Sequence, residues 1–249
     1  MKKTLWITNV ITIMLLIVIG LHYKIPTKIS NKFISSQTPI SKTITPALLD
    51  CSYELKYFDF HYKKEIGSPK IIMLGNSIVR HGDWEKLLDR NDVINRGISG
   101  DKISCMVERL KYLKNFNAKI WFIEGGINDL PGNTPISIFN YYKDIIEFIK
   151  NENAIPVINL VLYISPKAGI KFPSRSEYVN INKNIRELNE MLIEYALTQS
   201  IDYIDLNKII SDENDILKER YTTDGVHITN EAYDKWAILI NNLIKSYEI

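Results

Sequence analysis

Short apolar runs rich in Ile and Val alternate with segments of helical periodicity from residue 71 onward. The apolar runs predict strands at residues 71–75, 93–96, 120–124, 156–162 and 203–206. The periodic segments predict helices at residues 101–113, 136–151, 177–199 and 230–245. Alternation of this kind is typical of a parallel sheet covered by helices. With right-handed crossovers it predicts an α/β protein, a three-layer α/β/α sandwich around a flavodoxin-like parallel five-stranded sheet.

The N-terminus has a different pattern. Residues 5–21 form an uncharged, mostly apolar run of 17 residues behind Lys2 and Lys3. A bilayer span takes about 20 residues with a lower limit of about 17, whereas a cleaved signal peptide has a shorter apolar region followed by a small-x-small site. The sequence Gly20-Leu21-His22 fits such a site poorly. We therefore expect residues 1–23 to form an N-terminal transmembrane helix, as a membrane anchor or uncleaved signal.

The segment after this run is rich in Ser, Thr, Lys and Pro, which predicts a flexible tether at residues 24–47. Residues 48–249 are then expected to form one folded domain. An apolar run behind a basic start is the usual form of an export signal, so we expect a membrane-anchored protein with an extracytoplasmic domain.

Charge and cysteine content exclude some partners. The chain has 31 Lys and Arg against 29 Asp and Glu, and without Lys2 and Lys3 the two counts are equal at 29. Nucleic-acid binding is therefore not expected, because it depends on a basic surplus. Cys51 and Cys105 lie outside any zinc-binding pattern, so no metal site is expected. Two ordinary thiols are the favoured interpretation, with a single disulfide as the alternative.

The polar residues that follow the predicted strands are the candidates for chemistry, because ligands of open parallel sheets bind beyond the carboxyl ends of the strands. The first strand is followed by Ser77, the second by a loop containing Gly100, and the third by Asn128. Asp224 and His227 lie between the last strand and the terminal helix. Four loops thus bring a hydroxyl, flexible backbone, a carboxamide and an Asp/His pair to one edge.

Nucleophilic acyl transfer needs this set of groups. A serine hydroxyl becomes a good nucleophile when a base accepts its proton, and imidazole suits that role near neutral pH. We assign Ser77 as nucleophile, His227 as base and Asp224 as the carboxylate that orients the imidazole. An oxyanion needs preorganised donors, which we assign to the backbone N–H groups of Ser77 and Gly100 and to the side-chain amide of Asn128.

The four loops resemble the conserved blocks of the SGNH (GDSL-type) esterases and acylhydrolases, in the order found in that family. The blocks here read Leu-Gly-Asn-Ser77-Ile, Asn-Arg-Gly-Ile-Ser-Gly100-Asp, Gly-Gly-Ile-Asn128-Asp-Leu and Thr-Asp224-Gly-Val-His227. The resemblance covers about residues 69–245. It implies an α/β/α fold, no cofactor or metal, and hydrolysis of small esters or thioesters, with the same five residues in the roles given above.

One position departs from the family pattern. The first block commonly reads Gly-Asp-Ser, whereas here Asn76 precedes the nucleophile. The change removes one charge beside Ser77 and keeps the size and an acceptor oxygen. Among family members, this variant looks most similar to the bacterial carbohydrate O-acetylesterases.

The resulting hypothesis is a tethered serine esterase that removes a short acyl group, acetyl above all, from an extracytoplasmic glycan. The alternatives are a lysophospholipase or thioesterase, an acyltransferase, and a catalytically silent glycan-binding module. Residues 165–177 form a long connection and are a candidate pocket wall. The candidate substrate contacts are Arg80, His81, Trp84, Tyr163 and Arg175.

Overall fold

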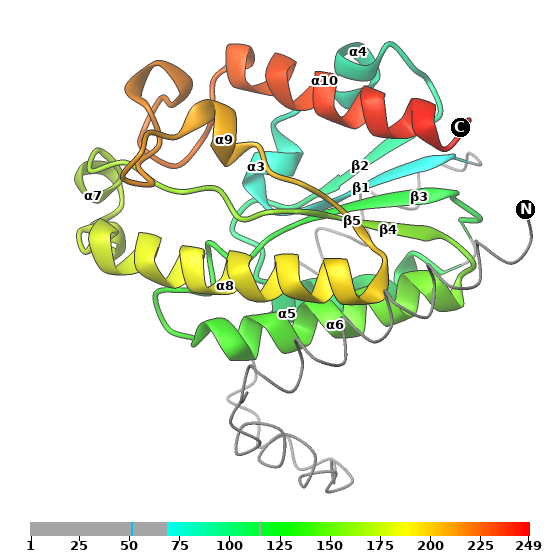
Figure 1. Ribbon diagram of the computed structural model, residues 1–249, viewed down its shortest axis with the longest axis horizontal. Coiled ribbons are helices and arrows are strands. Elements are labelled where there is room, and N and C mark those ends of the chain that lie inside the picture. The colour runs from blue at the N-terminus through cyan, green and yellow to red at the C-terminus, as the bar shows by residue number, and fades with distance from the viewer. Residues whose placement is uncertain (1–50, 52–68, 115) are drawn as a thin grey trace, which may run out of the picture. The chain divides into compact units, whose positions relative to one another are not determined.

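The computed structural model describes residues 51, 69–114 and 116–249 (Figure 1). The predicted anchor at residues 1–23 and the predicted tether at residues 24–47 lie outside the described residues. Within the described part of the chain, no helix combines the length and the apolar character that crossing a bilayer requires.

Five parallel strands form a single sheet with the order β2-β1-β3-β4-β5. The strands are β1 Ile71–Gly75, β2 Val93–Gly97, β3 Ile120–Glu124, β4 Ile155–Asn159 and β5 Asp202–Ile204. The predicted α/β class and five-stranded parallel sheet are confirmed. The chain runs from β1 to β2 on one side and then crosses from β2 to β3 on the other side of β1, so the point where the strand order reverses lies between β1 and β3.

Helices cover both faces of the sheet (Figure 1). One face carries α5 (Ile103–Arg109), α6 (Pro135–Asn151) and α8 (Tyr178–Gln199), and the other carries α4 (Trp84–Leu88) and α10 (Asn230–Ser246). Each long helix buries one stripe of apolar side chains; in α6 the stripe includes Ile138, Tyr142, Ile145 and Ile149. The shorter elements are α3 (Ser77–Arg80), α7 (Ala168–Lys171), α9 (Asn207–Ile210) and the 3₁₀ turns η2 (Leu110–Tyr112), η3 (Pro173–Arg175) and η4 (Glu219–Tyr221).

Strand β4 ends at Asn159, although the apolar run predicted a strand up to residue 162. Asparagine side chains satisfy the backbone beyond that point. Asn189 of α8 both accepts from Val161 N–H (2.9 Å) and donates to its carbonyl (2.9 Å), and Asn182 does the same at Ile164 (2.9 and 2.8 Å). The run is therefore buried and hydrogen-bonded without a neighbouring strand, because β5 is only three residues long.

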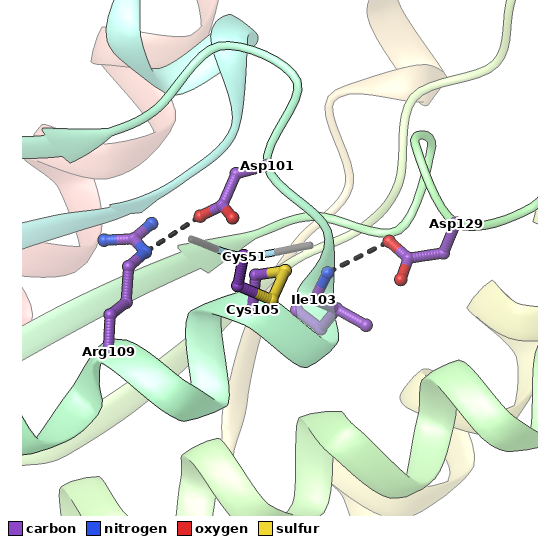
Figure 2. The surroundings of a disulfide bond; sticks show 6 residues. All are labelled: Cys51, Asp101, Ile103, Cys105, Arg109 and Asp129. Atoms are coloured by element: carbon purple, nitrogen blue, oxygen red, sulfur yellow. Dashed lines mark hydrogen bonds and ion pairs between the residues drawn. A yellow bond between two sulfur atoms is a disulfide. The ribbon is translucent and has the colours of Figure 1, made fainter. Parts of the chain in front are cut away.

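Cys51 and Cys105 form a disulfide, with their Cα atoms 5.6 Å apart (Figure 2). The favoured interpretation of two ordinary thiols is wrong, and the alternative holds. A sequence separation of 54 residues gives no information about distance in space, so the pairing could not be deduced from spacing. Closing a loop of this length removes about 4 kcal/mol of chain entropy from the unfolded state in the simplest model.

Candidate active site

The turn between β1 and α3 presents Ser77 at the carboxyl edge of the sheet. Asn76 caps the short helix, because its Oδ1 accepts a hydrogen bond from the Ile78 N–H at 2.7 Å. Gly75 admits no side chain: a Cβ there would lie 2.3 Å from Val79 Cγ2 and 2.6 Å from the Glu124 carbonyl oxygen. This close packing fixes the position of the Ser77 hydroxyl directly after a buried strand.

A chain of hydrogen bonds links Ser77, His227 and Asp224. His227 Nε2 lies 2.9 Å from Ser77 Oγ, and His227 Nδ1 lies 2.8 Å from Asp224 Oδ2. An ionised carboxylate can only accept, so in the neutral ring the proton sits on Nδ1 and Nε2 is free to accept the serine proton. The three groups are thus oriented for proton transfer from hydroxyl to imidazole.

The Asp224 carboxylate is strongly stabilised in its charged form. Burial alone would raise its pKa, but hydrogen bonds from the His227 ring and backbone, from Lys171 and from the Val226 N–H hold the pKa of Asp224 well below its usual range. Asp224 is therefore ionised at neutral pH, which lets it hold the imidazole and stabilise the imidazolium.

The loop that carries this pair depends on Gly225. Its φ is +88°, and a Cβ would lie 2.1 Å from the backbone N of Ala168. The Gly225 carbonyl accepts from the Ser165 N–H at 2.9 Å. The loop after β5 and the connection at residues 165–177, which is the candidate pocket wall, are therefore packed backbone against backbone.

Candidate oxyanion donors face the same cavity, which has a volume of about 340 Å³. Gly100, with φ at +81°, comes from the loop after β2, and Asn128 from the loop after β3. Asn128 Nδ2 donates to the Asp101 carbonyl at 2.9 Å, while its Oδ1 accepts from Arg175 Nη2 at 2.8 Å. Both ends of the amide are thus held in place beside Ser77.

Buried charges hold these loops together (Figure 2). Arg109 of α5 forms an ion pair with Asp101 at 2.8 Å, with both side chains almost completely buried, and donates to the Gly75 carbonyl at 3.0 Å. Asp129 Oδ2 accepts from the Ile103 N–H at the start of α5 at 3.0 Å. Burial raises the pKa of Asp129 to about 7, and the hydrogen bond from Ile103 offsets only part of this effect.

The candidate substrate contacts divide into two groups. His81 and Arg175 line the cavity beside Ser77, and the His81 ring lies 5.1 Å from that of His227. Burial lowers the pKa of His81, and the neighbouring His227 and Arg80 add to this effect. Arg80 itself is exposed and is not among the residues that line this cavity.

Trp84 and Tyr163 are placed away from the cavity, which corrects the sequence expectation. Trp84 is 2% exposed, packs edge-on against Trp236 and donates its indole N–H to the Val79 carbonyl at 2.7 Å. Tyr163 lines a separate cavity that also includes Arg186. Trp84 is thus directed into the core, and Tyr163 is directed toward α8.

Sequence reasoning did not single out Lys171, Phe172 or Glu124. Lys171 Nζ lies 3.0 Å from Asp224 Oδ2, and the Phe172 ring lies edge-on at 6.0 Å from the His227 ring. The only signal for the first two was their position in the connection at residues 165–177.

Among the described residues, no cluster of His, Cys, Asp and Glu side chains has the form of a metal site.

Glu124, the last residue of β3, is completely buried beside the turn between β1 and α3 that carries Ser77. Burial raises its pKa to about 8, and the neighbouring Asn76 side chain offsets this only in part. Two tyrosines face it from the helices on either side, Tyr142 of α6 and Tyr233 of α10, and burial followed by the charge of Glu124 raises the pKa of each phenol. Glu124 is therefore mostly protonated at pH 7. The neutral amide of Asn76 adds no charge beside this buried carboxyl group.

A family model described as "GDSL-like Lipase/Acylhydrolase family" matches residues 74–235, which contain all the loops described above. The chain belongs to this family. The resemblance drawn from the four blocks is confirmed, and this GDSL-like chain is a carboxylic ester hydrolase. No curated protein matches its sequence significantly.

Solved structures with the same fold include a GDSL-like lipase from Bacteroides thetaiotaomicron, which is 24% identical with a TM-score of 0.68, over 77% of this chain and 97% of that one. A protein from Bacteroides fragilis is also 24% identical, with a TM-score of 0.67, over 78% and 96%. A carbohydrate acetylesterase from Sinorhizobium meliloti is 13% identical, with a TM-score of 0.58, over 72% and 99%. At these identities the likeness concerns the fold alone.

The raised pKa of Glu124 predicts a pH-dependent stability. The folded state keeps a proton up to about pH 8 that an unfolded glutamate releases near its ordinary pKa of 4.5, so this contribution to the free energy of unfolding declines between those values. Glu124→Gln keeps the shape and does not titrate. Between pH 5 and pH 8, the urea unfolding midpoint should therefore fall more in the wild type than in this variant.

Asp129 is present in both proteins, so its own titration cancels in the comparison. Parallel pH profiles for wild type and Glu124→Gln would contradict the assignment of a buried, proton-binding Glu124.

Proposed function

We propose that this GDSL-like hydrolase is a serine esterase that removes short acyl groups, acetyl above all, from an extracytoplasmic carbohydrate. The observation that carries the proposal is the continuous hydrogen-bonded chain from Ser77 through His227 to Asp224, which opens onto a cavity with three candidate oxyanion donors. The hydroxyl, the imidazole and the carboxylate are in direct contact, and the residues of the candidate donors line the same cavity.

In the proposed mechanism, Ser77 Oγ attacks the acyl carbonyl while His227 Nε2 accepts its proton. The carbonyl oxygen becomes an oxyanion that accepts hydrogen bonds from the N–H groups of Ser77 and Gly100 and from the Asn128 amide. As the C–O bond to the alcohol breaks, His227 returns the proton to the leaving oxygen. Water then attacks the acyl-enzyme while His227 accepts its proton. The bond between the acyl carbon and Ser77 Oγ breaks, His227 returns the proton to Oγ, and the carboxylic acid leaves.

The size and polarity of the cavity favour a short acyl group. A long acyl chain needs a sustained apolar channel. Of the ten residues that line this cavity of about 340 Å³, seven have polar side chains, among them His81, Ser99, Ser174 and Arg175, and two, Phe172 and Val226, have apolar ones. A carbohydrate acetylesterase of the same fold among the structural neighbours is consistent with this choice.

The Cys51–Cys105 disulfide supports an extracytoplasmic domain, because structural disulfides persist mainly in oxidising compartments. Together with the apolar N-terminal run, it favours a membrane-anchored enzyme that acts outside the cytoplasm. A glycan or a small ester would then be the accessible substrate.

Ser77→Ala should abolish both covalent labelling by a fluorophosphonate and hydrolysis of p-nitrophenyl acetate by the full chain. The wild type should be labelled once, and the label should be found by mass spectrometry on the peptide that contains Ser77. Labelling that persists in the variant would remove Ser77 from the role of nucleophile. A wild type without activity on any short ester would instead favour a silent glycan-binding module.

Acyl length is the test of the substrate class. Among p-nitrophenyl esters, kcat/KM should be highest for acetyl and should fall for octanoyl and palmitoyl, because the cavity is small and most of its lining side chains are polar. A preference for the long chains would favour a lysophospholipase or thioesterase. Transfer of the acyl group to an added sugar in preference to water would favour an acyltransferase.

Asn128→Ala should lower kcat by about 10²- to 10³-fold, the usual loss for one oxyanion donor, with little change in KM. The oxyanion exists only after attack, so its donor contributes to the transition state and hardly to substrate binding. Steady-state kinetics on p-nitrophenyl acetate measure both constants. An effect on KM alone would mean that the amide only binds the substrate.

A further inference from the structure

The segment at residues 168–175, formed by α7 and η3, contacts both halves of the candidate active site. Lys171, the last residue of α7, lies 3.0 Å from the Asp224 carboxylate, and Arg175, the last residue of η3, lies 2.8 Å from the Asn128 amide oxygen. Between them, the Phe172 ring lies edge-on to the His227 ring. The two cations differ, since the Lys171 side chain is 62% exposed whereas Arg175 is 8% exposed.

Arg175 is bound to the loop after β3 through two neighbouring acceptors. Its Nη1 donates to the Ile127 carbonyl at 3.0 Å and its Nη2 donates to Asn128 Oδ1 at 2.8 Å. A planar guanidinium held at two points has a fixed orientation, which a lysine ammonium could not reproduce. The Phe172 ring forms a cation–π contact with the same guanidinium, and its centre lies 5.8 Å from the guanidinium carbon.

Counting donors and acceptors shows what this contact does to Asn128. A carboxamide has one oxygen and two N–H donors. Arg175 occupies the oxygen, and the Asp101 carbonyl occupies one N–H at 2.9 Å. One N–H is left for a ligand in the cavity. The flipped amide would place its NH₂ group against the guanidinium and its oxygen against the Asp101 carbonyl, so both contacts would be lost.

We propose that Arg175 is a positioning residue that locks the Asn128 carboxamide with an N–H directed at the acyl oxygen, and that its charge strengthens this donor in the transition state. A charged donor on the amide oxygen polarises the amide and makes the remaining N–H a better hydrogen-bond donor. This inference rests on the proposed function, and it changes the expected role of Arg175 from substrate contact to support of the oxyanion donor.

A double-mutant cycle tests the proposal with p-nitrophenyl acetate and the full chain. Arg175→Gln should lower kcat at least tenfold while KM changes less than threefold. In the Asn128→Ala background, the same substitution should change kcat by less than twofold, because no amide is left to position. Arg186→Gln is the matched control, since Arg186 pairs with Asp215 at a separate cavity, and its kcat should stay at the wild-type value.

Thermal unfolding of each variant separates positioning from folding. Arg175→Lys is the second variant, should Arg175→Gln not fold: it keeps the charge without the two-point contact, so its kcat should also fall in the wild-type background and stay unchanged in Asn128→Ala. Losses that add in the double variants would overturn the proposal, as would an effect of Arg175→Gln on KM alone or no effect of Asn128→Ala on kcat.

Ser77→Ala distinguishes a failure of the positioning role from a failure of the proposed function. If Ser77→Ala retains labelling and activity, the proposed function itself is wrong. If Ser77→Ala is inactive and the losses from Arg175 and Asn128 add, only the positioning role is wrong, and Arg175 acts independently of the amide.

Discussion

The buried ion pair between Arg109 and Asp101 is the contact on which the geometry of the site depends most. Arg109 also donates to the Gly75 carbonyl, so one guanidinium joins the end of β1 to the loop after β2. These two loops carry Ser77 and Gly100. Removing one member of a buried ion pair costs about 3–5 kcal/mol because the other charge is left without its partner. The relative position of Ser77 and Gly100 is therefore tied to the stability of the domain itself.

In the second half of the site, backbone packing joins the loop after β5 to the connection at residues 165–177. Gly225 lies against Ala168, so the loop with Asp224 and His227 can take its position only while the connection at residues 165–177 is in place. That connection in turn holds the Asn128 amide through Arg175. His227 and Asn128 thus share one support, although they follow different strands. Any movement of this segment would shift both groups together.

Much of the fold and of the candidate site could be predicted from local patterns. The buried strands β1 and β3 are continuous apolar runs. The rule that ligands bind beyond the carboxyl ends of strands then selects the candidate site residues Ser77, Gly100, Asn128, Asp224 and His227. What could not be predicted depends on distances between remote segments: the Cys51–Cys105 bond and the role of Arg175. The direction of a side chain cannot be predicted from a local sequence pattern either. For this reason the sequence places Trp84 in the pocket, whereas the side chain packs in the core.

The departure at residue 76 has a physical reason in Glu124. An aspartate before the nucleophile would place a second carboxyl group beside a glutamate that is already completely buried, and two neighbouring carboxylates cannot both ionise there at low cost. Asn76 keeps the capping oxygen that bonds Ile78 N–H and adds no charge. With its pKa raised to about 8, Glu124 itself contributes little negative charge beside Ser77 at pH 7. Because Asn76 adds no second acid beside Glu124, the amide at residue 76 and the buried acid at residue 124 are best understood as a matched pair.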